Sequence, residues 1–402
     1  MKVLCASLAT PGLLFPVVEV ATELARRGHN VDFATGLDFT GYLHERGFYR
    51  VPRTANDGPS FGIDGWGRPE KIVMQVKHLR YAIERSRPDA IVCSNLALGP
   101  LIAKELYDVP VGVLGSVVYL WPTQNQFNRG ANGDAFVTRL IWRFNEMKAA
   151  LEEARVACGL TPNDFTPENS PLLGDAFFVQ GVEELCRESG DLPDRVTFVG
   201  SCLHNLDDPS TGSELVDWIT SWRARGASIA YIQVGRSFTH TSFWPFFLEF
   251  SRQNLIASIV SIERYDAPVG DASPNVFIRD RLSQHAVLPH CDFVLCSGHP
   301  TAVLGAVSFG LPMIIAYTGS GTDDIGETLS AYGAAIAFSE SGSSIESLRS
   351  AIDAIATQPS FRERAQDLQG LFARKTGPAK VADALEALVP SLGHQAAIPS
   401  VL

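Results

Sequence analysis

The chain has 402 residues, of which 46% are hydrophobic and 19% are charged, and its net charge at pH 7 is −11. This composition is typical of a globular protein, and the length favours two domains of about 200 residues each. The acidic balance, with a pI near 5.3, argues against nucleic acid or an anionic membrane surface as the main partner, because both require a basic face. No apolar run approaches the roughly 20 residues that span a bilayer, so we expect no integral membrane segment.

The cysteines and the N-terminus indicate the compartment. The seven cysteines are scattered, odd in number and without a CxxC pair. That pattern favours free thiols in a reducing environment over disulfides or a zinc site. The N-terminus shows no basic region followed by a signal cleavage site and reads instead as a β-strand. We therefore expect a cytoplasmic protein with no metal site.

The first half of the chain alternates between apolar runs of strand length and amphipathic helices. It opens with an expected strand over residues 2–8, a helix over 13–27 with apolar residues at a period close to 3.6, and a strand over 31–35. Such a βαβ unit predicts a parallel sheet with a right-handed crossover. The other expected strands of this half are 49–52, 90–93, 111–115, 175–182 and 195–199, and the other expected helices are 37–46, 71–85, 96–106 and 135–158.

Two long loops interrupt this alternation. Residues 53–69 are rich in glycine, proline and aspartate, and residues 116–134 read as an irregular segment rich in aromatic and amide side chains. A loop of this length inside a compact domain is more often functional than idle. The second loop is interpreted as a ligand wall, with a lid or a protein interface as the other interpretations.

Residues 201–213 form the best linker, because the segment is polar and contains proline and glycine. A second alternating series follows it. Its expected strands are 229–234, 256–261 and 276–278, and its expected helices are 214–225, 243–253, a short helix ending at His290, 344–357, 360–372 and 378–388. We predict domains over 1–205 and 214–375, with 376–402 forming a C-terminal helix that crosses back to the N-terminal domain.

The stretch 291–335 carries the clearest sign of a ligand site. Apolar strands are expected over 292–296 and 313–317, with a helix over 300–309 between them. Small residues precede this helix and Pro300 occupies its first position, so free N–H groups and the positive end of the helix dipole would suit a phosphate. In a parallel sheet the loops after both strands leave at the same carboxyl edge, which is where ligands bind.

Several short motifs agree in order and spacing with one known family. They are Pro11-Gly12 with Pro16, Leu24-Ala25-Arg26-Arg27-Gly28-His29, Leu288-Pro289-His290-Cys291, Phe309-Gly310-Leu311-Pro312, and Glu327 with Gly333-Ala334. On these motifs the chain resembles the two-domain GT-B glycosyltransferases, in particular the nucleotide-sugar-dependent group that decorates antibiotics, lipids and small aglycones. The resemblance covers nearly the full length. It implies an α/β fold of two Rossmann-like doubly wound domains that face each other across a cleft, with the acceptor domain first and the donor domain second.

The chain departs from the family at positions that normally carry chemistry. The general base that follows Gly12 in the family is replaced by Leu13, which cannot take a proton. Gly305 stands where the family has the acid that binds the ribose hydroxyls, and Gly321-Thr322 stand where it has the Asp-Gln pair that reads the sugar. Leu13 leaves three interpretations open: an inactive protein, a displaced base, or an acceptor that needs little deprotonation, such as a carboxylate or a stabilised phenol.

The resemblance assigns candidate residues to each half. The candidate replacement bases are Asp57, Asp64 and Asp134, each of which is equally a solvated loop carboxylate. The acceptor-binding candidates are Leu13, Tyr119, Trp121 and Phe127. The donor-binding candidates are Ser297, Gly298, His299 and Thr301 at the diphosphate, Arg236 and Ser237 opposite them, Arg281 and Leu282 at the base, and Thr322, Asp323 and Asp324 at the sugar.

The implied function is an inverting, metal-independent transfer of a hexosyl group to a small secondary-metabolite-type acceptor. A UDP- or TDP-sugar would be the co-substrate, with no other cofactor, and the protein would act alone or as a homodimer. The competing hypothesis is a non-catalytic GT-B homologue that serves as a binding or auxiliary partner of an active enzyme. The missing base and the missing sugar-reading pair motivate that second hypothesis.

Overall fold

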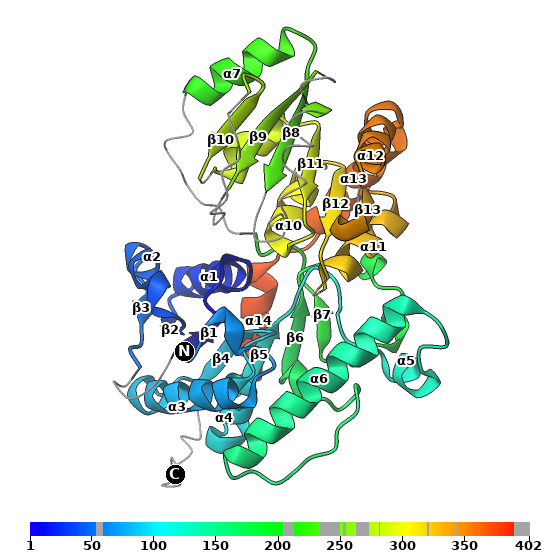
Figure 1. Cartoon of the computed structure of the whole chain (residues 1–402). Coiled ribbons are helices and arrows are strands. Elements are labelled where there is room, and N and C mark those ends of the chain that lie inside the picture. Colours follow the sequence, from blue (N-terminus) through cyan, green and yellow to red (C-terminus); the bar gives the residue numbers. More distant parts are fainter. Residues whose placement is uncertain are drawn as a thin grey trace. The chain divides into compact units, whose positions relative to one another are not determined.

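The computed structural model describes residues 1–53, 59–203, 213–233, 250–251, 255–262, 273–280, 282–319, 321–342 and 344–389. The chain divides into two compact units, one made of Met1–His204 with Lys375–Leu402 and the other of Asn205–Arg374. Each unit is built on a parallel sheet with helices packed on it (Figure 1). The prediction of two Rossmann-like α/β domains is therefore confirmed.

The first unit contains a seven-stranded sheet in the order β3-β2-β1-β4-β5-β6-β7, and every pair of neighbours is parallel. The strands are β1 (Lys2–Ala6), β2 (Asn30–Ala34), β3 (Tyr49–Arg50), β4 (Ala90–Ser94), β5 (Val111–Leu114), β6 (Ala176–Val179) and β7 (Val196–Phe198). Its α-helices are α1 (Pro11–Arg26), α2 (Thr40–Glu45), α3 (Pro69–Ser86), α4 (Gly99–Tyr107), α5 (Gln124–Arg129), α6 (Ala135–Ala157) and α14 (Pro378–Leu388).

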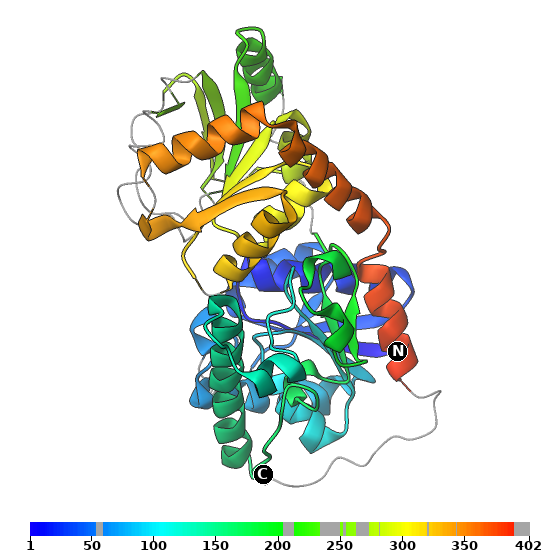
Figure 2. The same ribbon diagram turned by 90° about the vertical axis from the view of Figure 1, so that its right-hand side faces the viewer.

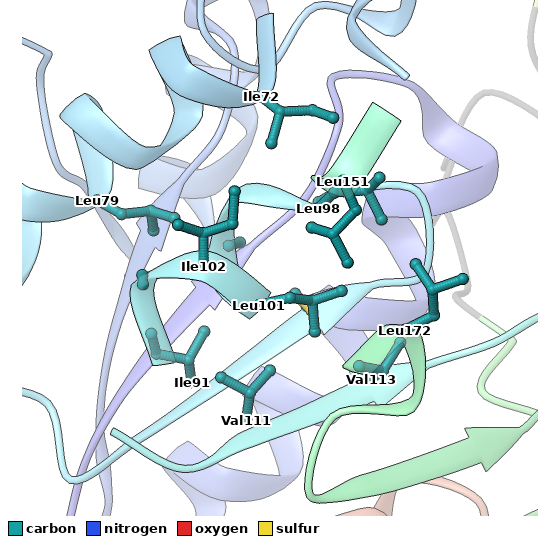
Figure 3. Packing of buried hydrophobic residues seen from close by; sticks show 14 of the residues in the cluster. Ile72, Leu79, Ile91, Leu98, Leu101, Ile102, Val111, Val113, Leu151 and Leu172 are labelled. Atoms are coloured by element: carbon teal, nitrogen blue, oxygen red, sulfur yellow. The ribbon is translucent and has the colours of Figure 1, made fainter. Parts of the chain in front are cut away.

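Helices cover both faces of this sheet, as a doubly wound topology requires. Buried side chains of α3, α4 and α6 pack against β4 and β5 in one core cluster, and Figure 3 shows Leu79, Leu101 and Leu151 among them. Side chains of α1, α2 and α14 form a second cluster on the other face. Burial of each such Leu, Ile or Val side chain contributes about 1.5–3 kcal/mol to folding.

The second unit contains a six-stranded parallel sheet in the order β10-β9-β8-β11-β12-β13. The strands are β8 (Ser228–Gln233), β9 (Ile256–Ser261), β10 (Val276–Arg279), β11 (Phe293–Cys296), β12 (Met313–Tyr317) and β13 (Ala335–Ser339). The helices are α7 (Ser213–Arg223), α9 (Gln284–Val287), α10 (Pro300–Ser308), α11 (Thr322–Tyr332), α12 (Ile345–Thr357) and α13 (Pro359–Ala373). In the described part of the chain, no helix combines the length and the apolar character needed to cross a bilayer.

Two expectations about local structure were wrong. The segment expected to be irregular contains helix α5, which begins with a capping box: the Thr123 N–H donates to Gln126 Oε1 at 2.9 Å and the Gln126 N–H donates to Thr123 Oγ1 at 3.2 Å. This Thr-x-x-Gln pattern is a helix-start signal in the sequence. Strand β13 was not expected at all, and it forms because it pairs with β12 at the edge of the sheet. The expected helix 243–253 and the linker lie largely outside the described residues.

Helix α14 returns to the first unit and packs beside α1, as the red and blue helices show in Figure 1 and, from another side, in Figure 2. Arg27 joins the two helices: its Nε donates to Glu23 Oε1 at 2.8 Å and its Nη1 donates to Asp383 Oδ1 at 2.6 Å and to Glu386 Oε2 at 3.2 Å. His29 Nε2 lies 2.7 Å from Glu386 Oε1. A charged network thus holds the end of the chain against the first helix.

We predict that Arg27→Met weakens the docking of α14. The Arg27 side chain is only 19% exposed and binds carboxylates on two helices, and a hydrogen bond to a charged group contributes about 1.5–3 kcal/mol. Arg26→Met is the matched control, because Arg26 is 70% exposed and pairs only with Glu23 on its own helix. Hydrogen exchange of α14 should rise in Arg27→Met and stay unchanged in Arg26→Met.

The same network sets a pH dependence. Hydrogen bonds from Arg26 and Arg27 lower the pKa of Glu23 to about 2, from an ordinary value of 4.5, and the hydrogen bond with His29 lowers the pKa of Glu386. The stabilisation is therefore present above pH 4.5 and is lost as the pH falls toward 2. Equal exchange rates for α14 in wild type and Arg27→Met at pH 7 would contradict the assignment.

Candidate functional site

The strand order of the second sheet reverses between β8 and β11. Loops that leave the two strands on either side of such a reversal diverge, and the space at their carboxyl ends is where open α/β sheets bind ligands. The loop after β11 consists of residues 297–299 and leads into α10, and the loop after β12 ends at the start of α11. These are the loops that the sequence placed at one edge.

The two loops are in direct contact through Gly298. This glycine has φ +82°, and a Cβ on it would lie 3.0 Å from the carbonyl oxygen of Thr322 and 3.1 Å from Cγ2 of Ile315. Both the backbone conformation and the close approach require glycine. The expectation that the loops after β11 and β12 meet at one edge is confirmed.

The N-terminus of α10 presents an unused donor. His299 is the N-cap residue with an extended backbone, its side chain makes no capping hydrogen bond, and the imidazole is exposed. The N–H groups of Ala302 and Val303 both bond to the His299 carbonyl oxygen at 3.1 Å, whereas the Thr301 N–H donates to no described residue. The dipole of α10 and this free N–H together favour an anion.

The loop before α11 is held by its own polar side chains. Thr322 Oγ1 donates to the Gly319 carbonyl oxygen at 2.6 Å. Asp323 Oδ1 accepts from the N–H groups of Gly321 at 3.1 Å and of Asp324 at 3.0 Å. Asp324 is fully buried. Thr322 and Asp323 therefore have structural roles at the start of α11.

The side chain of Gln284, the first residue of α9, fills the space beside Gly305. A Cβ at Gly305 would lie 2.3 Å from Gln284 Oε1, so the carboxamide of Gln284 occupies the place where a side chain on α10 would begin. Gln284 Nε2 lies 3.4 Å from Gln233 Oε1 and from the Thr301 carbonyl oxygen. The close approach of Gln284 requires a residue without a side chain at position 305, and a glycine inside a buried helix was the sequence signal for it. Leu282, two residues before, is buried in the protein.

The two candidate bases that the structure describes, Asp64 and Asp134, have structural partners. Leu13 lies half-buried in the first turn of α1. Asp64 is exposed, with its Oδ2 3.7 Å from Nζ of Lys71. Asp134 caps α6 by accepting from the Phe136 N–H at 2.8 Å and the Val137 N–H at 3.3 Å.

The aromatic candidates divide into core and half-buried residues. Tyr119 and Trp121 are 6% and 2% exposed and belong to the core, where Tyr119 packs edge-on against Phe177. Their rings offer no surface to a ligand in this structure. Phe127 is half-buried and packs edge-on against Phe144, so it is the aromatic residue of this group that keeps an accessible part.

Four candidates lie outside the described residues: Asp57, Arg236, Ser237 and Arg281. Among the residues that the structure does describe, no three His, Cys, Asp or Glu side chains come together as metal ligands. The seven cysteines are free, as the sequence suggested, and burial raises the pKa of Cys296 at the end of β11 to about 12.

Residues 254–388 match the family described as "Erythromycin biosynthesis protein CIII-like, C-terminal domain". Over 96% of its length the chain is 22% identical to 4'-demethylrebeccamycin synthase of Lentzea aerocolonigenes, and the alignment covers 99% of that protein. The structure resembles the glycotransferase of kitacinnamycin, with a TM-score of 0.71, 21% identity, and coverage of 97% of this chain and 99% of the other. It also resembles the spinosyn rhamnosyltransferase SpnG complexed with thymidine diphosphate, with a TM-score of 0.69, 18% identity, and coverage of 96% and 100%.

The similarities to these three proteins each cover at least 96% of both chains, whereas the family match covers residues 254–388. The chain therefore has the GT-B fold, as the sequence motifs implied, and it is similar to glycosyltransferases of antibiotic biosynthesis.

We predict that Gly298→Ala destabilises the second unit by about 1–3 kcal/mol, because alanine at φ +82° is strained and its Cβ meets the Thr322 backbone. Gly370→Ala is the control of opposite sign. Gly370 lies inside α13 with nothing within 4 Å, so alanine should stabilise that helix by up to about 1 kcal/mol. Urea unfolding measures the change in the free energy of unfolding for each variant. Equal unfolding midpoints for Gly298→Ala and Gly370→Ala would show that the contact at Gly298 is absent.

Proposed function

We propose that this chain, with the GT-B fold and an EryCIII-like C-terminal domain, transfers a hexosyl group from a nucleoside diphosphate sugar to a small secondary-metabolite-type acceptor. The observation that carries the proposal is the Thr301 N–H at the start of α10, which has no acceptor in the described part of the chain and lies at the point where the strand order reverses. SpnG, which has this fold, is known with thymidine diphosphate bound. A TDP- or UDP-sugar is accordingly the proposed co-substrate.

The proposed donor site assigns the diphosphate to residues 297–301. The Thr301 N–H and the α10 dipole would bind the phosphate oxygens, with the exposed His299 imidazole beside them. Gln284, which occupies the space above Gly305, would hydrogen-bond to the nucleoside through its carboxamide. Arg236, Ser237 and Arg281 complete the proposed site from the sequence. Asp323 is proposed to face the sugar, whereas Asp324 is fully buried and is no longer assigned to it.

The proposed reaction is an inverting displacement. An acceptor oxygen attacks the anomeric carbon in line with the bond to the diphosphate, which breaks as the new C–O bond forms. Negative charge then grows on the leaving diphosphate, where a helix N-terminus and N–H groups stabilise it. Because these groups supply that stabilisation, we propose a reaction that needs no metal ion.

A second function is supported by a specific observation. Leu13 cannot act as a base, and the Thr322 hydroxyl donates to the Gly319 carbonyl oxygen. Neither residue can therefore perform the role that its position has in the family. A non-catalytic GT-B homologue that binds a nucleotide and assists an active enzyme would show the same features. Half-buried Leu13 and Phe127 remain the proposed acceptor contacts in either case.

We predict that TDP or UDP raises the melting temperature. A ligand at 100 times its dissociation constant stabilises the folded state by about 2.7 kcal/mol. His299→Ala and Arg236→Ala should each reduce the shift. Arg225→Ala should leave it unchanged, because the Arg225 guanidinium stacks on Trp222 at the end of α7. A shift that survives both site variants would remove the assigned diphosphate site, and no shift with any nucleotide would remove the donor-dependent function.

Turnover separates the two functions. With a TDP-sugar and a panel of small aromatic acceptors, we expect a glycoside whose anomeric configuration, measured by NMR, is opposite to that of the donor. EDTA should leave the rate unchanged. Nucleotide binding without turnover on any acceptor would support the auxiliary role, and retention of configuration would refute the in-line displacement.

A further inference from the structure

The first unit contains a buried cation without an anionic partner among the described residues. Arg50, the last residue of β3, is 9% exposed. Its Nε donates to Thr40 Oγ1 at 2.8 Å, and its Nη1 donates to the carbonyl oxygens of Thr35 at 3.2 Å and Val51 at 3.3 Å. All three acceptors are neutral. The Nη2 group has no acceptor among the described residues and is not enclosed by them.

Within the described ranges no carboxylate pairs with Arg50. His78, which is fully buried, places its Nε2 3.0 Å from the same Val51 carbonyl oxygen and its Nδ1 2.8 Å from Ser60 Oγ. Burial and the charge of nearby Arg53 both lower the pKa of Arg50. A buried charge normally has a counter-charge, because transfer of an unpaired ion out of water is strongly unfavourable.

Arg50 lies at the edge where ligands of the first unit are expected. Thr35 follows β2 and Val51 follows β3, so the guanidinium sits at the carboxyl ends of these strands. The loop after β1, which leads into α1 and Leu13, touches the loop after β2: a Cβ at Gly36 would lie 2.5 Å from the Cβ of Ala9. The cation and the first turn of α1 therefore flank one group of loops.

We propose that Arg50 is an anion site that holds the carboxylate of an acidic acceptor. This inference rests on the proposed function and narrows its acceptor to carboxylate-bearing molecules. Nε and Nη1 already donate to neutral acceptors, so Nη2 is the group that offers the carboxylate a charged hydrogen-bond donor.

A carboxylate acceptor is also compatible with leucine at position 13, where the family has a general base. A carboxylate is already ionised at pH 7. An acceptor that reacts through it forms its new C–O bond as the bond to the diphosphate breaks, and no proton has to be removed. A leucine at the position of the family base does not impede that reaction.

The test compares benzoate with benzamide, two probes of nearly equal size that differ in charge. The full-length protein is titrated with each by ligand-observed NMR, and benzoate should bind at least about tenfold more tightly, as expected for a charge-assisted pair. Arg50→Met should abolish that preference. Arg46→Met should keep it, because Arg46, at the end of α2, stacks on the Tyr42 ring at 3.9 Å.

Two further measurements keep the result decisive. Arg50→Lys retains the positive charge without the planar guanidinium, so it should keep a reduced preference for benzoate. It also tests the effect of charge if Arg50→Met does not fold. The TDP-induced shift in melting temperature is followed in parallel, so failure of the donor site is seen separately from failure of this one. Equal binding of benzoate and benzamide to wild type, unchanged benzoate binding in folded Arg50→Met, or equally tight binding of inorganic phosphate would overturn the carboxylate site.

Discussion

Parallel pairing of β8 with β11 is the constraint on which the second unit depends. Phe293 lies opposite Ala230 in this pairing, and from it the strand order runs outward in both directions. Parallel neighbours must be joined by crossovers, so helices cover the sheet and every loop after a strand emerges at the same edge. The start of α10, the start of α11 and the carboxamide of Gln284 are brought together only by that arrangement. β1 and β4 play the same part in the first unit.

At the carboxyl ends of β11 and β12, the backbone geometry and the side chains can be considered separately. Gly298 permits the contact of the two loops, which is a backbone property that survives the replacement of the usual ligand-binding side chains. At Gly305 the replacement is coupled to a neighbour, since Gln284 occupies the volume that a longer residue would need. A helix N-terminus can still bind a phosphate without those side chains, because its donors belong to the backbone. The backbone geometry at the start of a helix therefore does not depend on which polar side chains surround it.

Two arginines of the first unit differ in their hydrogen-bond partners, and this difference indicates different roles. Arg27 is surrounded by Glu23, Asp383 and Glu386, and these ion pairs hold α14 against α1. Arg50 is less exposed, yet its described acceptors are two carbonyl oxygens and a hydroxyl. A satisfied charge stabilises packing, whereas an unsatisfied buried charge at a ligand-binding edge has capacity for an anion. The same residue type therefore carries different roles, which the surroundings determine.

The sequence by itself determined the succession of strands and helices, because apolar runs bounded by glycine and proline depend only on neighbouring residues. Ile256–Ser261, Met313–Tyr317 and Pro378–Leu388 agree with their predictions to the residue, and the fold follows from motifs whose order is visible in the chain. Strand β13 was missed because an edge strand exists only through its partner. Tertiary structure alone decided that Gln284 fills the space at Gly305, that Tyr119 is buried, and that the described acceptors of Arg50 are neutral. Each of these depends on which residues far apart in the chain come into contact, and local pattern carries no information about that.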